Sequence, residues 1–158
     1  MVNREALLAW LYLQQGVDAV QDAVGRDLER VAGCTLHEHV TLYRLKVAPE
    51  QRLTMAELAE LLAVSPSGVT RLVDRLVRRG WITRYQPPDN RRTVYAVLAE
   101  PGLKVLREHS QREYRRSVAE HFTSTLDEGD VEHLARIGRK LLESHGRWDA
   151  KRFATPPG

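Results

Sequence analysis

Arginine, the side chain best suited to bind phosphate and read base edges, is concentrated in one stretch of this 158-residue chain. Between Val64 and Arg92 there are seven arginines, two acids and no lysine, a local net charge of +5 on a chain whose total is +3. The remainder of the chain is therefore close to neutral. A basic patch on a nearly neutral body is typical of a nucleic-acid-binding surface, so this stretch is the first candidate for function.

Apolar spacing and capping residues predict two short helices at the start of this stretch. Thr54 and Glu57 form a capping box that begins a helix over 55–63. Ser65 is a good N-cap for a second helix over 66–79, whose apolar residues recur at helical spacing. The opposite face of this second helix is polar and carries Ser67, Thr70, Arg71, Asp74, Arg75 and Arg78. Two short helices joined by a tight turn predict a helix-turn-helix.

A β-hairpin with a basic tip is expected directly after these helices. Two β-rich runs, 81–86 and 93–98, flank a turn-prone loop over 87–92. A helix fits the major groove of DNA, and a narrow minor groove attracts arginine. The sequence therefore predicts a winged helix-turn-helix that binds double-stranded DNA through Ser65, Ser67, Thr70, Arg71 and Arg75 on the helix and Asn90, Arg91 and Arg92 in the loop.

The rest of the chain is predicted to be helical and to form one domain with this unit. Helical periodicity and caps place further helices over 4–31, 35–46, 102–125 and 127–144. The expected fold is mainly α, an α+β winged helix-turn-helix with six helices and a two-stranded β-wing. Within a single domain over 1–158, we expect the DNA-binding part over 35–99 and a helical part over 4–31 and 101–144.

Several other functional classes lack the residues that they need. A single cysteine, Cys34, cannot form a disulfide framework or a pair of zinc-binding thiols. The apolar run around Leu7–Leu13 is far shorter than the ~20 residues that span a bilayer, so no membrane partner and a cytoplasmic location are expected. The sequence contains neither a Gly-x-Ser-x-Gly motif nor the Gly-Lys of a phosphate-binding loop. We therefore expect a protein that is not an enzyme and needs no cofactor.

Three segments make the chain resemble the MarR (multiple antibiotic resistance regulator) family. They read LTMAELA over 53–59, VSPSGVTRLVDRL over 64–76 and RGWI over 79–82, and the helix order agrees from about Glu5 to Ser144. The resemblance implies a homodimer joined by its first and last helices, which binds a pseudo-palindromic site and in most members represses transcription. It also implies that a small effector releases the DNA.

The wing departs from the pattern of this family. An Asp-x-Arg motif is usual there, with the aspartate orienting the arginine. Alignment back from the following helix places Asn90 and Arg92 at these positions, whereas a slip of one residue would use Asp89 and Arg91. Both alternatives remain open for the wing-tip arginine.

A small organic molecule is the default effector. In the family such ligands bind between the dimerisation helices and the winged domain. The residues that would line such a pocket in this chain are Trp10, His39, Tyr43 and Arg44. Each of these side chains could equally be an ordinary part of the core or surface.

Two further effectors and one different function are the alternatives. The zinc-responsive members of the family use a Glu-His pair and later histidines, which Glu38, His39 and His109 match in part, although Glu113 replaces the last histidine. Oxidation would have to act on Cys34, which lies outside the region used by peroxide-sensing relatives. A winged helix used as a protein-interaction module is the competing function, but its binding face should be less charged.

Overall fold

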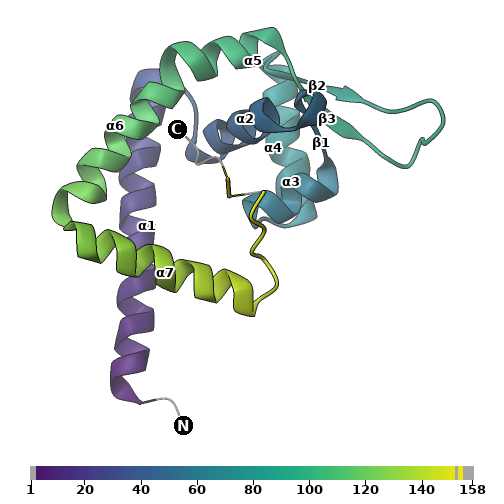
Figure 1. Ribbon diagram of the computed structural model, residues 1–158. Coiled ribbons are helices and arrows are strands. Elements are labelled where there is room, and N and C mark those ends of the chain that lie inside the picture. The colour runs from purple at the N-terminus through teal and green to yellow at the C-terminus, as the bar shows by residue number, and fades with distance from the viewer. Residues whose placement is uncertain (1–2, 152, 155–158) are drawn as a thin grey trace. The chain divides into compact units, whose positions relative to one another are not determined.

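The computed structural model describes residues 3–151 and 153–154 and is mostly helical (Figure 1). Its helices are α1 (Arg4–Ala32), α2 (Leu36–Val47), α3 (Met55–Leu62), α4 (Pro66–Arg78), α5 (Glu100–Val105), α6 (Gln111–His121) and α7 (Glu128–Ser144). Its strands are β1 (Arg52–Thr54), β2 (Ile82–Tyr85) and β3 (Tyr95–Leu98). The mainly helical fold with a β-wing is confirmed.

The sheet has three antiparallel strands in the order β1-β3-β2, so the prediction of a two-stranded wing was incomplete. Strand β1 spans only three residues between the helices predicted over 35–46 and 55–63, and it pairs Leu53 with Ala96 of β3. An edge strand of this length is too short to show the alternation of apolar and polar residues by which a strand is recognised in a sequence. It forms because β3 offers it unpaired backbone groups, which no local pattern announces.

The helix ends follow the capping residues read from the sequence. The Thr54 hydroxyl accepts a hydrogen bond from the Glu57 amide, while the Glu57 carboxylate accepts one from the Thr54 amide. The Ser65 hydroxyl accepts the Gly68 amide at the start of α4. Gly80 follows α4 with a φ of +69°, a left-handed conformation that glycine adopts without strain.

The helix predicted over 102–125 is not continuous. After α5 the backbone forms a π-helical turn over Leu106–Ser110, then continues as α6, and a 3₁₀ turn over Thr123–Thr125 follows. The Ser110 hydroxyl lies 3.0 Å from Nδ1 of the buried His39 on α2. The π-helical turn thus contains a residue that contacts a buried histidine of another helix, and the apolar periodicity of the sequence does not predict this contact.

The chain forms two compact units. One contains the described parts of Met1–Val24 and Tyr114–Pro156, and the other is Gly25–Glu113. The helix-turn-helix and the sheet thus lie together with α2 and α5 in the second unit, whereas α1 contributes residues to both. The expected single domain, with a DNA-binding part over 35–99 and a helical part over 4–31 and 101–144, stays a prediction.

The second unit has a continuous apolar core. Helix α4 contributes Val69, Leu72, Val73 and Leu76, each at most 3% exposed. Other buried members come from α2, α3, the sheet and the π-helical turn, and they include Leu42, Tyr43, Leu45, Leu58, Ile82, Ala96 and Leu106. Burial of one face of α4 leaves the opposite face to solvent.

The first unit leaves large apolar side chains uncovered. Helix α1 exposes Trp10 (62%) and Tyr12 (66%), and helix α7 has no buried residue. Within the residues that the structure describes, no helix is long and apolar enough to cross a membrane.

The glycine at position 102 permits a close contact inside the second unit. A Cβ built on Gly102 would lie 2.2 Å from the Trp81 carbonyl oxygen and 3.1 Å from Cδ2 of Leu42. We expect Gly102→Ala to lower the free energy of unfolding by about 1–3 kcal/mol, because the clash with the backbone outweighs the higher helix propensity of alanine.

Urea denaturation measures this effect, and Gly25→Ala is the matched control. Gly25 is also helical, but its Cβ would have no heavy atom within 4 Å. This control should be neutral or stabilised by up to about 1 kcal/mol. Equal stability of the two variants would contradict the close contact.

Candidate nucleic-acid interface

The N-terminal end of α4 is an exposed polar surface. Ser65, Ser67 and Thr70 are all exposed, and the Ser65 and Ser67 hydroxyl oxygens lie 3.1 Å apart. The Thr70 hydroxyl donates to the Pro66 carbonyl oxygen. Small side chains let another surface approach closely, and the free amides of a helix N-terminus favour an anion such as phosphate. The local geometry suits contact with DNA.

Three of the arginines between 64 and 92 have acidic partners. Arg84 of β2 pairs with Asp74 of α4 at 2.6 Å, which joins the wing to the helix. Arg75 and Arg79 both face Glu38 of α2, at 3.7 and 3.2 Å. These pairs reduce the positive charge that the three side chains present to a ligand.

The other arginines of this stretch form an uncompensated group, which we call the free arginines. They are all exposed, and in the described part of the chain none has a carboxylate within 4.0 Å: Arg71, Arg78, Arg91 and Arg92. Two lie on α4 and two in the hairpin loop. Within this stretch, the positive charge available to a ligand therefore lies on α4 and the hairpin loop.

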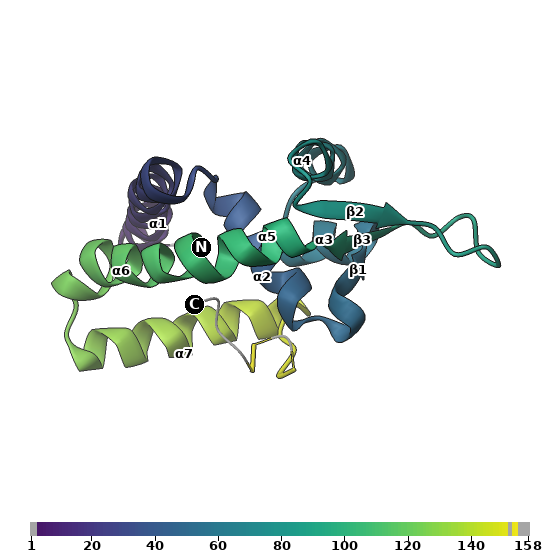
Figure 2. The ribbon, with the colours of Figure 1, turned by 90° about the horizontal axis from the view of Figure 1, so that it is seen from above.

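The hairpin loop extends beyond the ends of strands β2 and β3 (Figure 2). The Asn90 side-chain oxygen accepts a hydrogen bond from the Arg92 amide, and the Gln86 side chain donates to the Arg91 carbonyl oxygen. Asn90 thus shapes the backbone and does not hold the Arg92 guanidinium, as an Asp-x-Arg motif would. Arg91 and Arg92 are both exposed, so the choice between them stays open.

The proposed effector residues fall in different surroundings. His39 and Tyr43 are buried in the core of the second unit, and Arg44 is half-buried there. Trp10 belongs to the first unit and is exposed. Burial lowers the pKa of His39 to about 4, so its imidazole is neutral near pH 7. His39 and Tyr43 serve as packed core residues in this structure.

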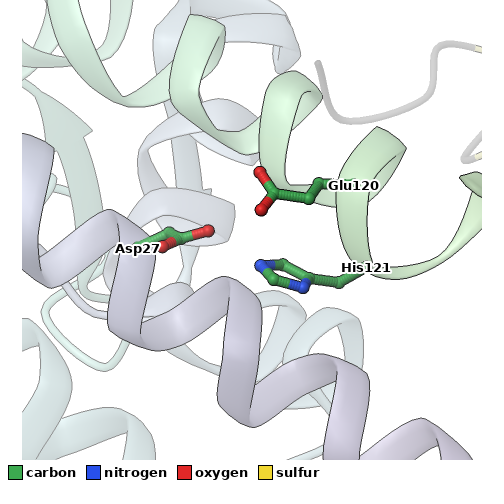
Figure 3. Close-up of side chains that lie close together, drawn as sticks. All are labelled: Asp27, Glu120 and His121. Atoms are coloured by element: carbon green, nitrogen blue, oxygen red, sulfur yellow. The ribbon is translucent and has the colours of Figure 1, made fainter.

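The residues considered for zinc do not converge. Glu38 is engaged by arginines, His39 faces Ser110, and His109 is half exposed beside Glu108. Glu120 and His121 are neighbours on α6, and Figure 3 draws them with Asp27. Because Asp27 belongs to the other unit, we assign no metal site to these three side chains.

The single thiol is poorly suited to sense oxidants. Cys34 is 1% exposed, and burial, followed by the neighbouring Glu38 carboxylate, raises its pKa to about 11. Oxidation proceeds through the thiolate, which such a pKa suppresses near neutral pH. Cys34 therefore packs as a small apolar side chain.

The first unit contains a cavity of about 770 Å³ that sequence reasoning missed. Apolar side chains of α1, α6 and α7 line it, among them Leu13, Val17, Val118, Leu134 and Ile137. The helical stripes of these residues are visible in the sequence. Only folding shows that the stripes leave a hollow between them instead of a filled core.

Glu38 is a second feature that the sequence did not single out as structural. Thr35 and Glu38 form a capping box on α2, a spacing that is readable in the sequence. Its ion pairs with α4 join residues about 40 positions apart, and no local signal predicts them.

Comparison with known proteins agrees with this geometry. The model of the MarR family matches residues 34–94. The chain is 30% identical to the multiple antibiotic resistance protein MarR of Salmonella typhimurium over 57% of its own length and 62% of that protein. It is also 30% identical to the transcriptional repressor MprA of Escherichia coli, over 65% of its own length and 57% of that protein. The chain thus spans less than two thirds of these two relatives.

A solved structure matches this chain over a larger part of its length than those two relatives do. The MarR family transcriptional regulator Sco3205 from Streptomyces coelicolor, solved in complex with DNA, has a TM-score of 0.83 and 27% identity. This match covers 91% of the chain and 89% of Sco3205. With its helix-turn-helix, β-wing and matching segments, the chain resembles MarR family transcriptional regulators over most of its fold, and residues 34–94 match the model of that family.

Proposed function

We propose that the protein is a homodimeric transcriptional repressor that binds a pseudo-palindromic operator in double-stranded DNA. The free arginines on α4 and the hairpin loop carry this proposal. They leave the basic surface open on the two elements that a winged helix presents to DNA. A repressor must reach the DNA that it binds, which agrees with the expected cytoplasmic location. This proposed function involves no catalysed reaction.

The arrangement of α4 supports binding in the major groove. Its apolar face is buried, and its polar face exposes Ser67, Thr70, Arg71, Arg75 and Arg78. A helix of about 10–12 Å diameter fits a groove about 12 Å wide. The basic hairpin loop would then reach the neighbouring minor groove, where arginine is favoured. A protein-interaction module would instead need an apolar centre in this face.

Exposed apolar surface in the first unit supports a homodimer. Trp10 and Tyr12 on α1, Ile137 and Leu141 on α7, and the apolar cavity are costly to leave in water. We propose that a second copy of the chain covers them. The family resemblance implies the same helices for dimerisation, and two copies would give two DNA-reading units for a symmetric site.

Repression and effector release are the finer parts of the proposal. The name of the relative MprA, a transcriptional repressor, favours repression. A small organic effector is favoured because Cys34 is buried and because Glu38, His39 and His109 do not converge as metal ligands.

Removing one free arginine should weaken DNA binding through charge. We expect Arg71→Gln to raise the Kd for operator DNA by roughly tenfold and to reduce the slope of log K against log salt by about 1, because one phosphate contact is lost. Fluorescence anisotropy at several salt concentrations measures both quantities. The operator probe is a duplex selected from a random library by the wild-type chain.

The matched control for this experiment is Arg107→Gln. Arg107 is also exposed, but it lies on the π-helical turn, away from α4 and the hairpin loop in the chain. This variant should keep the wild-type Kd and salt slope. Equal losses in both variants would show that net charge, and not the α4 surface, governs binding.

A charge on the apolar stripe of α7 should disrupt the dimer. Ile137 is 41% exposed and lines the cavity, so Ile137→Arg would place a charge in the proposed interface. Sedimentation velocity should then report a monomer, with operator affinity greatly reduced. The control Ala135→Arg introduces the same charge elsewhere on α7 and should remain dimeric. A dimeric Ile137→Arg protein would contradict the interface.

The thiol of Cys34 should react slowly in the folded protein. With a pKa of about 11, only about one thiol in a thousand is ionised at pH 8, and the side chain is buried. We expect labelling by an aromatic disulfide reagent to be much faster in urea, and peroxide to leave operator binding unchanged. Rapid labelling without denaturant, with loss of DNA binding, would favour an oxidant as the effector.

A further inference from the structure

Helix α2 carries a buried carboxylate that connects it to the DNA-reading helix. Glu38 is only 3% exposed, although an unpaired buried charge is strongly unfavourable. Its partners are a backbone amide and two arginines of the α4 region. The two carboxylate oxygens have different partners, and this division distinguishes the two arginines.

The first oxygen, Oε2, anchors the end of α4. It accepts a hydrogen bond from the Thr35 amide at 2.9 Å and one from the Arg79 guanidinium at 3.2 Å. Arg79 also donates to the Gly33 carbonyl oxygen at 2.7 Å and stacks 3.5 Å from the centre of the Trp81 ring. All of these partners lie within the second unit, so the contacts of Arg79 stabilise the fold of that unit.

The second oxygen, Oε1, faces Arg75 without fully binding it. Its distance to Nε of Arg75 is 3.7 Å, which is an ion pair too long for a hydrogen bond. The Arg75 side chain is 46% exposed, on the polar face of α4. The carboxylate therefore attracts the guanidinium toward one side of the helix and leaves its donors able to bind another group.

Arg71, one helical turn earlier, has no such support. It is exposed and has no carboxylate partner within the described part of the chain. An arginine without a carboxylate partner suits a phosphate, which can be approached from many directions, whereas a base edge demands a fixed two-pronged geometry. Arg71 and Arg75 of α4 would thus meet DNA under different constraints.

We infer that Glu38 is a positioning residue for sequence recognition: it holds Arg75 for contact with a base edge, while Arg71 serves a phosphate. The inference rests on the proposed function. Restricting Arg75 before binding lowers the entropic cost of ordering it at the base. Glu38 itself is buried on α2 and touches no DNA, so its removal changes no phosphate contact directly.

Glu38→Gln tests this role, because glutamine keeps the shape and can still accept the Thr35 amide. We expect its Kd for the selected operator duplex to rise roughly five- to tenfold, the effect of losing one well-placed base contact. Its Kd for a scrambled duplex should change less than about twofold, with the salt slope unchanged.

The matched control is Glu57→Gln. Glu57 has the same capping-box position on α3, with Thr54, but it is exposed and pairs with no arginine in the part of the chain that the structure describes. It should retain wild-type preference for the operator. Urea denaturation of each variant reports the folded fraction, since a loss of folded protein would weaken binding to both duplexes equally.

A double-mutant cycle with Arg75→Gln tests whether Glu38 affects operator preference through Arg75. If Glu38 acts through Arg75, Glu38→Gln should have no further effect on operator preference in the Arg75→Gln background. An undiminished effect there, or equal weakening on operator and scrambled DNA, would overturn the inference.

Arg75→Lys keeps the test decisive if Glu38→Gln fails to fold. Lysine preserves the charge but not the two-pronged donor geometry, so operator preference should fall while the salt slope stays the same. Wild-type preference in this variant would exclude base reading by Arg75. A wild-type chain that prefers no duplex would overturn the proposed function, whereas preference retained by Glu38→Gln would overturn the positioning role alone.

Discussion

Burial of one face of α4 is the constraint on which the rest of the structure depends. Val69, Leu72, Val73 and Leu76 are held in the core of the second unit, so the opposite face of the helix must be exposed. Removing four such side chains from water contributes roughly 6–12 kcal/mol before the cost of chain ordering. That gain fixes the rotation of α4 about its axis, and with it the direction in which Arg71 and Arg78 project.

Carboxylates then decide how the remaining positive charge is distributed. Asp74 pairs with Arg84 across the junction of α4 and the wing, and Glu38 pairs with Arg79 behind the helix. These contacts orient α4 and the wing, the two elements proposed to bind DNA, and they neutralise the charges of Arg79 and Arg84. The part-buried Glu38 contact has fewer competing water molecules than an exposed ion pair. Within 64–92, the arginines that have no carboxylate partner among the described residues lie on the exposed face of α4 and on the loop.

The first unit differs from the second in its apolar side chains. Its helices leave many of them exposed, whereas the second unit buries them in a core. Helix α7 has an amphipathic sequence but no buried residue, and α1 exposes Trp10 and Tyr12. An apolar cavity lies among these helices. A second copy of the chain would cover this surface and, by symmetry, double the number of DNA contacts, so stability and function would depend on the same association.

The sequence by itself determined the helices of the helix-turn-helix, their caps and the outward arginine face, because these follow from local periodicity and capping at Thr54, Ser65 and Gly80. It did not predict strand β1, the π-helical turn opposite His39, or the choice of Arg75 and Arg79 as partners of Glu38. Each of these depends on groups far apart in the chain. Only tertiary structure decides such features, since backbone pairing and burial of a charge gain their energy from whichever distant group the fold places beside them.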